Sequence, residues 1–154
     1  MTNRSFRLFS IAVCAAAVAV ATAATPTLTS SAKPTVTVYK DPGCGCCKNW
    51  IEHLKKHGYR VDAKDTPDMM QIKSTLGVPG DLRSCHTAVV EGYLIEGHVP
   101  ATDIDRLLTD KPRVKGLAVP GMPMGSPGME GPTSQHYQVI AFDKSGKSRV
   151  FASH

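Results

Sequence analysis

Three of the chain's five cysteines lie within residues 44–47, a Cys-Gly-Cys-Cys motif between two segments of different periodicity. Residues 35–39 before the motif are β-branched and aromatic, which predicts a strand. In 47–57 the apolar residues recur at helical spacing, and Gly58 follows as a typical helix end. A strand that turns directly into a helix points unpaired N–H groups and the positive end of the helix dipole at these sulfurs. This field favours the thiolate, which is both a nucleophile and a soft-metal ligand.

The first 23 residues have the pattern of a secretory signal peptide. Two arginines precede an apolar run at 8–20, and a small-x-small sequence follows, so cleavage is expected near Ala23. A membrane anchor is the first alternative, but the run is shorter than the about 20 residues that span a bilayer. A lipoprotein is the second, and the bulky Val13 before Cys14 disfavours it. The sequence therefore predicts a periplasmic protein without stable membrane insertion after cleavage.

Cleavage also changes the charge and the cysteine count. Removing two arginines from the 18 basic residues leaves 16 against 13 acidic residues, a mild surplus. No basic stripe with interleaved aromatic residues is present, so nucleic acid is not an expected partner. Because disulfides persist in the periplasm, the four remaining cysteines could simply form two structural disulfides.

The remaining chain predicts a flexible lead-in at 24–34 and one domain at 35–154. Strands are expected at 35–39, 59–63, 87–90 and 93–95, and helices at 47–57, 68–76 and 100–108. A parallel β-α-β unit followed by an antiparallel hairpin predicts one mixed α/β sheet flanked by helices, with the thioredoxin-like order β-α-β-α-β-β-α. The Gly/Pro/Met-rich stretch 116–131 is expected to lack regular structure. A C-terminal hairpin at 137–151 is expected to extend or cover the sheet.

The cysteine motif is compatible with four roles. Cys44 and Cys47 alone would form the C-x-x-C of a thiol–disulfide oxidoreductase, in which Cys44 attacks and Cys47 resolves. Cys46 is a third cysteine that such a redox motif does not need. Adjacent cysteines suit a zinc site poorly, because structural zinc is usually held by two separated knuckles. Thiolates at a helix start suit Cu(I), which they can bridge. Copper binding is the favoured interpretation, with dithiol redox chemistry and structural disulfides or zinc left open.

Cys85 and His86 directly precede the strand at 87–90. In the predicted topology this position faces the start of the first helix, so either Cys85 or His86 is expected to supply the fourth ligand. A capping or core role for His86 remains open. The nearest proline, Pro79, lies six residues before Cys85 rather than at the position that supports peptide binding in thioredoxin enzymes, which disfavours generic disulfide exchange.

Methionine and histidine add weaker candidates. Met122 and Met124 carry thioethers, which are soft ligands for Cu(I); the alternative is that they fill gaps over the core. His53 and His57 have the i,i+4 spacing of a metal site, but charged neighbours indicate a solvated helix face.

Three motifs in order resemble the CopG-type family of exported bacterial proteins. They are Asp-Pro-Gly-Cys-Gly-Cys-Cys-x-x-Trp at 41–50, Ser-Cys-His-Thr-Ala-x-Val-x-Gly-Tyr-x-Ile-Glu-Gly-His-Val-Pro-Ala at 84–101, and Gly-Leu-Ala-Val-Pro-Gly-Met-Pro-x-Gly-Ser-Pro-Gly-Met-Glu at 116–130. The family is associated with copper resistance and a thioredoxin-like fold.

The resemblance implies a copper site made by Cys44, Cys46 and Cys47 with Cys85. It also implies a periplasmic role in holding or interconverting Cu(I) and Cu(II), with room for more than one ion. Whether the protein catalyses turnover is left open. Copper ions, and other periplasmic copper carriers or efflux components, are the expected partners.

Overall fold

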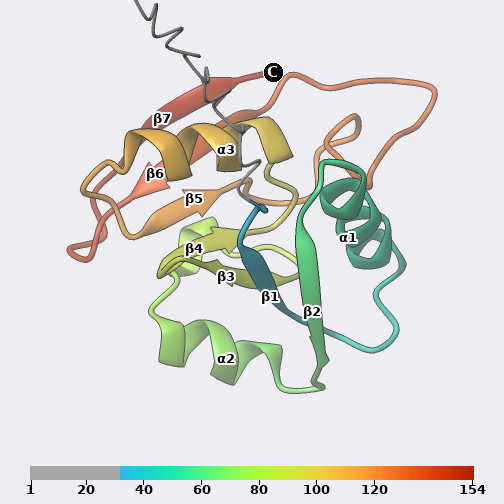
Figure 1. Ribbon diagram of the computed structural model, residues 1–154, viewed down its shortest axis with the longest axis horizontal. Helices are drawn as coiled ribbons and strands as arrows, with labels where there is room; N and C mark the ends of the chain where they lie inside the picture. Colours follow the sequence, from blue (N-terminus) through green and yellow to red (C-terminus); the bar gives the residue numbers. More distant parts are fainter. Residues whose placement is uncertain (1–31) are drawn as a thin grey trace, which may run out of the picture. The chain divides into compact units, whose positions relative to one another are not determined.

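The computed structural model describes residues 32–154, which form a seven-stranded mixed sheet in the order β2-β1-β3-β4-β5-β6-β7 with three α-helices (Figure 1). The expected signal peptide at 1–23 and most of the lead-in lie outside the described residues. Within 32–154, no helix has both the length and the apolar character that a membrane span requires.

The elements follow the chain in the predicted order. The strands are β1 (Thr35–Lys40), β2 (Arg60–Asp65), β3 (Thr87–Val90), β4 (Tyr93–Glu96), β5 (Gly116–Ala118), β6 (Gln138–Phe142) and β7 (Ser148–Ser153). The helices are α1 (Gly45–Lys56), α2 (Met69–Leu76) and α3 (Ala101–Asp110), with a short 3₁₀ turn, η1 (Gly80–Leu82), before β3.

The pairing of the first four strands agrees with the expected topology. β1 and β2 are parallel, with α1 as their crossover, and β3 is antiparallel to both β1 and β4. The β3–β4 turn consists of Glu91 and Gly92, whose φ angles of 45° and 83° give the backbone twist that a two-residue hairpin needs. The mixed α/β class and the β-α-β-α-β-β-α order are thus confirmed. The name thioredoxin-like stays a prediction.

The stretch 116–131 was expected to be irregular throughout, and its first three residues correct that expectation. They form β5, which pairs in parallel with β4 and antiparallel with β6. A side chain at Gly116 would meet the backbone of Leu94, so the glycine permits this close pairing. Leu117 and Ala118 are fully buried on the two faces of the sheet. The C-terminal hairpin β6–β7 then extends the sheet, as predicted.

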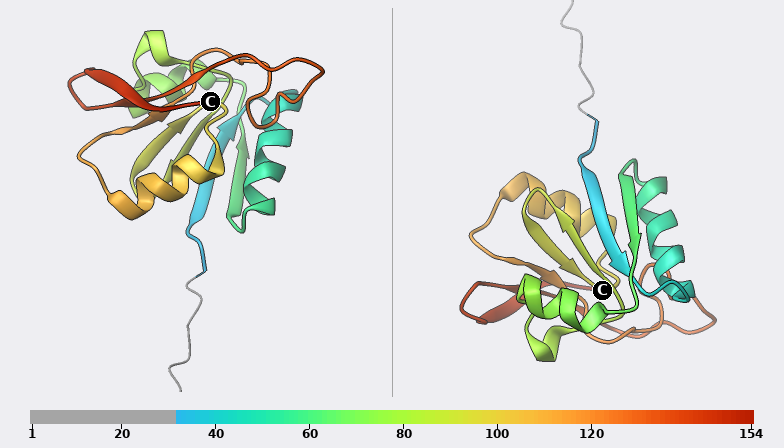
Figure 2. Two further views of the ribbon diagram at one scale, coloured as in Figure 1. Left: turned by 90° about the horizontal axis from the view of Figure 1, so that it is seen from above. Right: turned by 90° about the horizontal axis from the view of Figure 1, so that it is seen from below.

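Two buried clusters lie on opposite faces of the sheet, because side chains alternate along each strand. The larger cluster packs α1 and α3 against the sheet through Trp50, Leu54, Ile104 and Leu107. The smaller cluster is formed mainly by Val78, Leu82, Leu94, Ala118 and Phe142. Figure 2 shows α2 on the side of the sheet away from α1 and α3.

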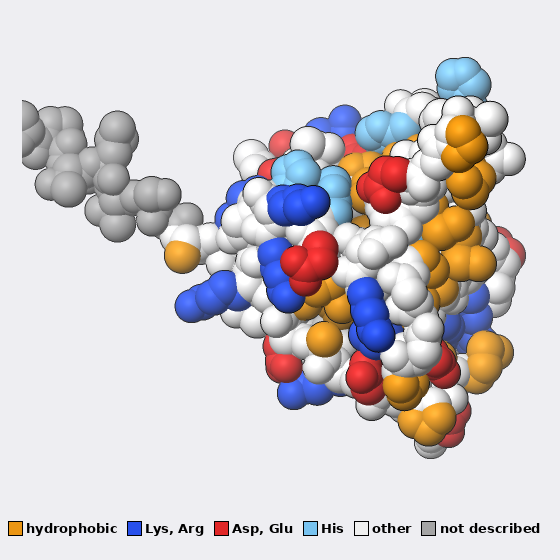
Figure 3. Space-filling view, turned by 90° about the vertical axis from the view of Figure 1, so that its right-hand side faces the viewer, with side chains coloured by type: hydrophobic (Ala, Val, Ile, Leu, Met, Phe, Trp, Pro, Cys, Tyr) orange, Lys and Arg blue, Asp and Glu red, His pale blue; other side chains and the backbone are white. Residues whose placement is uncertain are grey.

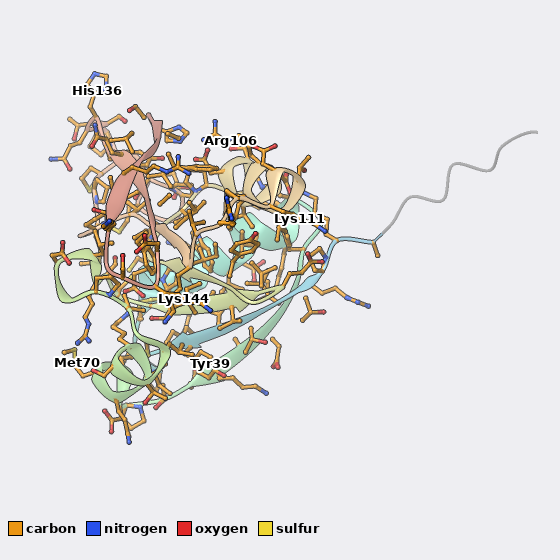
Figure 4. The ribbon with its side chains drawn as sticks, turned by 90° about the vertical axis from the view of Figure 1, so that its left-hand side faces the viewer. Tyr39, Met70, Arg106, Lys111, His136 and Lys144 are labelled. Atoms are coloured by element: carbon orange, nitrogen blue, oxygen red, sulfur yellow. A yellow bond between two sulfur atoms is a disulfide. The ribbon has the colours of Figure 1, made fainter. Side chains whose placement is uncertain are left out.

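The helix ends agree closely with the local signals. Asp68 caps α2 by accepting a hydrogen bond from the Gln71 N–H at 3.2 Å, and Gly77 ends the helix with a φ of 72°. On the same helix, Met70 points into solvent with 62% exposure (Figure 4), so its thioether is a surface group. α1 begins at Gly45, two residues before its apolar pattern, because Cys44 acts as its N-cap.

Candidate functional site

The first turn of α1 holds three cysteines in a fixed arrangement. The Asp41 carboxylate accepts from the Gly43 N–H at 2.8 Å, and the Asp41 carbonyl accepts from the Cys44 N–H at 3.1 Å, which shapes the turn out of β1. The Cys47 N–H donates to Cys44 Sγ at 3.3 Å. A backbone N–H that has no carbonyl partner within the helix thus donates to a sulfur, as the position of the motif between a strand and a helix predicted.

Cys44 and Cys47 form a disulfide, whereas Cys46 and Cys85 are free thiols. Cys47 is fully buried against the core, and Cys46 is partly exposed. Cys46 Sγ lies 3.5 Å from Cys44 Sγ, so the third sulfur stays in contact with the disulfide. The structure therefore shows the C-x-x-C pair in its oxidised state.

Cys85 comes from the segment between η1 and β3 and meets the motif from across the fold. Its Sγ and those of Cys44, Cys46 and Cys47 all lie within 4.8 Å of one another. We refer to these four residues as the cysteine cluster. Burial raises the pKa of the Cys85 thiol to about 12, with a further contribution from Cys46. Cys85 is consequently a thiol at neutral pH, and a bound metal ion would have to displace its proton.

Two imidazoles flank Cys85. His86 Nδ1 lies 3.3 Å and His98 Nε2 lies 3.1 Å from Cys85 Sγ, and these three residues form a second group of closely spaced donors. Burial lowers the pKa of both histidines, so both are neutral at pH 7 and retain a lone pair. His98 Nδ1 lies 2.7 Å from the Pro127 carbonyl oxygen, which favours the tautomer with its proton on Nδ1 and its lone pair toward Cys85.

The structure gives His86 the surroundings of a core residue, and its role as a metal ligand stays a prediction. It is fully buried, and its ring lies 4.3 Å from that of Trp50, as a core residue's would. Its Nε2 is the one buried side-chain nitrogen or oxygen within residues 32–154 that has no hydrogen-bond partner. An unpartnered buried nitrogen is costly, which makes it a candidate to bind a ligand.

His98 is the site residue that the sequence reasoning missed. The β3–β4 register pairs Thr87 with Glu96, and the Gly97 N–H donates to the His86 carbonyl at 3.0 Å. Extending this register by two residues places His98 opposite Cys85. The two-residue turn was visible in the sequence, so counting outward from it would have found the pair.

The loop 119–131 covers the start of α1 and supplies one soft donor to the cysteine cluster. Met122 Sδ lies 3.9 Å from Cys46 Sγ, and Met122 is half exposed. At Gly128 the loop runs so close to α1 that a Cβ would lie 2.7 Å from the Trp50 nitrogen. Figure 2 shows this loop reaching across to α1. Met124, the other methionine candidate, lies with its methyl group against Gly131 instead.

The His53–His57 pair has a structural role. The Ala101 N–H donates to His53 Nε2 at 3.1 Å, so His53 satisfies the first backbone donor of α3. His57 Nδ1 lies 2.8 Å from the His53 carbonyl oxygen. Figure 3 shows basic, acidic and histidine side chains interspersed on the side of the molecule that carries α1. His57 is exposed, as expected for a solvated helix face, whereas His53 is half-buried because it packs against the start of α3.

Soft donors from three separate segments thus converge at one place: α1, the β3–β4 hairpin and the loop 119–131. A family model described as "Protein of unknown function, DUF411" matches residues 82–129, which contain the β3–β4 hairpin and most of the loop 119–131. No curated protein matches the chain.

Two solved structures are similar over most of the fold. They are titled "Copper resistance protein copG", Form 2 and Form 1, and each is 46% identical to this chain. Each match covers 79% of this chain and 98% of the other, with TM-scores of 0.76 and 0.75 respectively. At this identity and coverage, the chain belongs to the CopG family.

Proposed function

We propose that this protein binds copper in the periplasm through the cysteine cluster and takes part in copper resistance or homeostasis. The observation that carries the proposal is the convergence of Cys44, Cys46, Cys47 and Cys85, whose sulfurs lie within 4.8 Å of one another although Cys85 is far from the others in sequence. Thiolates this close can share one soft ion or bridge several.

The surrounding donors favour copper over zinc. Met122 adds a thioether beside Cys46, and thioethers select Cu(I) over harder ions. His98 and His86 add neutral imidazoles beside Cys85, and imidazole is a ligand that copper accepts. Solved relatives at 46% identity carry copper resistance in their titles.

The Cys44–Cys47 disulfide limits when the site can load. While it is present, the cluster offers two free thiols, Cys46 and Cys85, instead of four. Full thiolate ligation therefore requires two-electron reduction of the disulfide. Copper loading and dithiol oxidation therefore compete for the same two sulfurs, Cys44 and Cys47.

The test is an anaerobic titration of the reduced mature protein with Cu(I) against a competing Cu(I) chelator. Copper binding by the cluster predicts strong competition by the wild type and its loss in Cys46→Ser. Met122→Leu should weaken competition, whereas Met124→Leu, its matched control in the same loop, should leave it unchanged. No competition by the wild type, or unchanged competition in Cys46→Ser, would contradict the proposal.

A thiol–disulfide oxidoreductase is the second candidate, and the Cys44–Cys47 disulfide at the start of α1 is the observation that favours it. This function predicts that Cys46→Ser retains exchange activity with glutathione or insulin, because Cys46 belongs to neither half of the C-x-x-C pair. Cys44→Ser should abolish it. The two candidates therefore respond in opposite ways to Cys46→Ser.

A further inference from the structure

A buried ion pair lies directly behind the Cys85 segment. Lys73 of α2 and Glu96 at the end of β4 are 3% and 0% exposed, and Lys73 Nζ lies 2.6 Å from Glu96 Oε1. Burying two charges costs several kcal/mol per ion on general grounds, and an apolar pair of the same volume is often as stable. Stability alone therefore does not account for charges at these two positions.

The other contacts of the Glu96 carboxylate indicate what the pair does. Its Oε1 accepts from the Ser84 N–H at 2.6 Å, and its Oε2 accepts from the Thr87 hydroxyl at 2.6 Å. Lys73 Nζ also donates to Thr87 Oγ1 at 2.9 Å. Ser84 and Thr87 are the residues on either side of Cys85-His86. One carboxylate thus holds both ends of the segment that carries the fourth cysteine.

The same segment is tied to the loop that carries the thioether. The Ser84 hydroxyl donates to the Gly121 carbonyl oxygen, one residue before Met122. Cys85 itself lies outside any helix or strand, and the backbone hydrogen bond from the Gly97 N–H reaches only as far as the His86 carbonyl. The hydrogen bonds to Glu96 add a restraint at both ends of the segment.

We propose that the Lys73–Glu96 pair is a positioning device that holds Cys85 against the other sulfurs of the cysteine cluster. The consequence for copper rests on the proposed function, but the positioning does not. Partners in the outer shell of metal sites orient the ligands, and their loss typically weakens metal binding by about 10–100-fold.

Two double variants separate positioning from charge. Lys73→Met with Glu96→Leu removes both charges and the hydrogen bonds that these two side chains make with Ser84 and Thr87. Lys73→Met with Glu96→Gln also removes both charges but keeps a side-chain oxygen that can accept from Ser84. Because each removes the charges together, neither leaves a buried ion unpaired. Asp103→Asn controls for general loss of stability, since Asp103 is 5% exposed and pairs with His154 and Arg106.

The first readout needs no copper. Protein oxidised at Cys44–Cys47 retains the free thiols Cys46 and Cys85, which diamide can join. The two thiols lose two electrons and two protons to diamide, which becomes the hydrazine. The cross-link is followed by mass spectrometry. A displacement of about 1 Å can slow such a step about 100-fold, so the Leu double variant should cross-link at least about tenfold more slowly. The Gln double variant should stay within about threefold of wild type.

The second readout is Cu(I) competition by the reduced proteins. The Leu double variant should bind about 10–100-fold more weakly, and the Gln double variant close to wild type. An unchanged cross-linking rate in the Leu variant would overturn the positioning role, and so would equal slowing in both double variants or in Asp103→Asn. If wild type binds no Cu(I), the proposed function fails, and the cross-linking rates alone still decide the positioning role.

Discussion

Gly128 is the residue at which the loop 119–131 meets α1, and its replacement by alanine is the sharpest test of how the site is assembled. Its φ is +87°, and an added Cβ would lie 2.7 Å from the Trp50 nitrogen and 2.8 Å from the Cys46 carbonyl oxygen. Both are backbone atoms of the helix that carries the cysteine motif, so a side-chain rotation cannot relieve the overlap. Gly128→Ala should therefore push the loop away from α1.

Gly128→Ala combines the cost of a left-handed φ with the cost of overpacking, and the same substitution at a second glycine measures the first cost alone. An L-residue at a left-handed φ costs about 1–2 kcal/mol. Overpacking against a fixed backbone adds about 1–3 kcal/mol. Gly146, in the β6–β7 turn, has a φ of +84° and nothing within 4 Å of an added Cβ, so Gly146→Ala carries the first cost alone. The expected losses of unfolding free energy are about 2–5 kcal/mol for Gly128→Ala and about 1–2 kcal/mol for Gly146→Ala.

Urea unfolding measures this difference, and the fluorescence of the single tryptophan, Trp50, reports on the core beneath the loop. Displacing the loop also removes Met122 from Cys46 and the Pro127 carbonyl from His98. Gly128→Ala should thus weaken Cu(I) competition, while Gly146→Ala should not. Equal losses of stability in the two variants would refute the close contact on which this reasoning depends.

Two further predictions concern the packing of α1. Trp50→Phe should lower the unfolding free energy by about 1–3 kcal/mol, because the buried Val99 carbonyl loses the indole N–H that donates to it at 2.9 Å. Circular dichroism during urea unfolding measures this loss. A change below about 0.5 kcal/mol would contradict the prediction. Burial lowers the pKa of His53 from 6.5 to about 4. Between these two pH values the unfolded chain binds more protons than the folded chain does. The stability contributed by neutral His53 is therefore complete above pH 6.5 and declines as the pH falls toward 4. His53→Gln keeps an acceptor for the Ala101 N–H but cannot titrate, so urea midpoints between pH 7 and 4.5 should fall less steeply than in wild type; parallel declines would show that His53 is not responsible.

Local signals were sufficient to predict most of the fold. Asp68 and Gly77 delimit α2 through a side-chain cap and a left-handed φ, both of which depend only on neighbouring residues. The Glu91-Gly92 turn likewise fixes the β3–β4 register by itself. β5 could not be predicted in this way, because its three residues, 116–118, lie in a glycine- and proline-rich stretch. They become a strand only by pairing with β4 and β6, and neither pairing can be read from a local pattern.

The site likewise has some features that could be predicted from the sequence and others that could not. The prediction that Cys85 or His86 faces the cysteine motif followed from topology, and the structure places the Cys85 sulfur with those of the motif. The contact of Met122 rather than Met124 with Cys46 depends on the path of an irregular loop, for which the sequence has no periodic signal. The choice between thiols and a disulfide at Cys44 and Cys47 is a matter of oxidation state, and spacing alone permits both.

Close contacts between backbone segments bring the donor side chains of this site together. Gly97 has a φ of +70°, and an added Cβ would lie 2.6 Å from the Ser84 side chain and 2.7 Å from the Val119 carbonyl oxygen. The missing side chain therefore lets the Cys85 segment and the loop converge on the end of β4, as Gly128 does at α1. These contacts involve glycine, backbone atoms and the Ser84 side chain, and not the donor atoms themselves. Met122 is half exposed, so its thioether can be replaced without disturbing these contacts, whereas His98 is fully buried and its Nδ1 lies 2.7 Å from the Pro127 carbonyl oxygen. The two donors are therefore tied to the stability of the fold to different degrees.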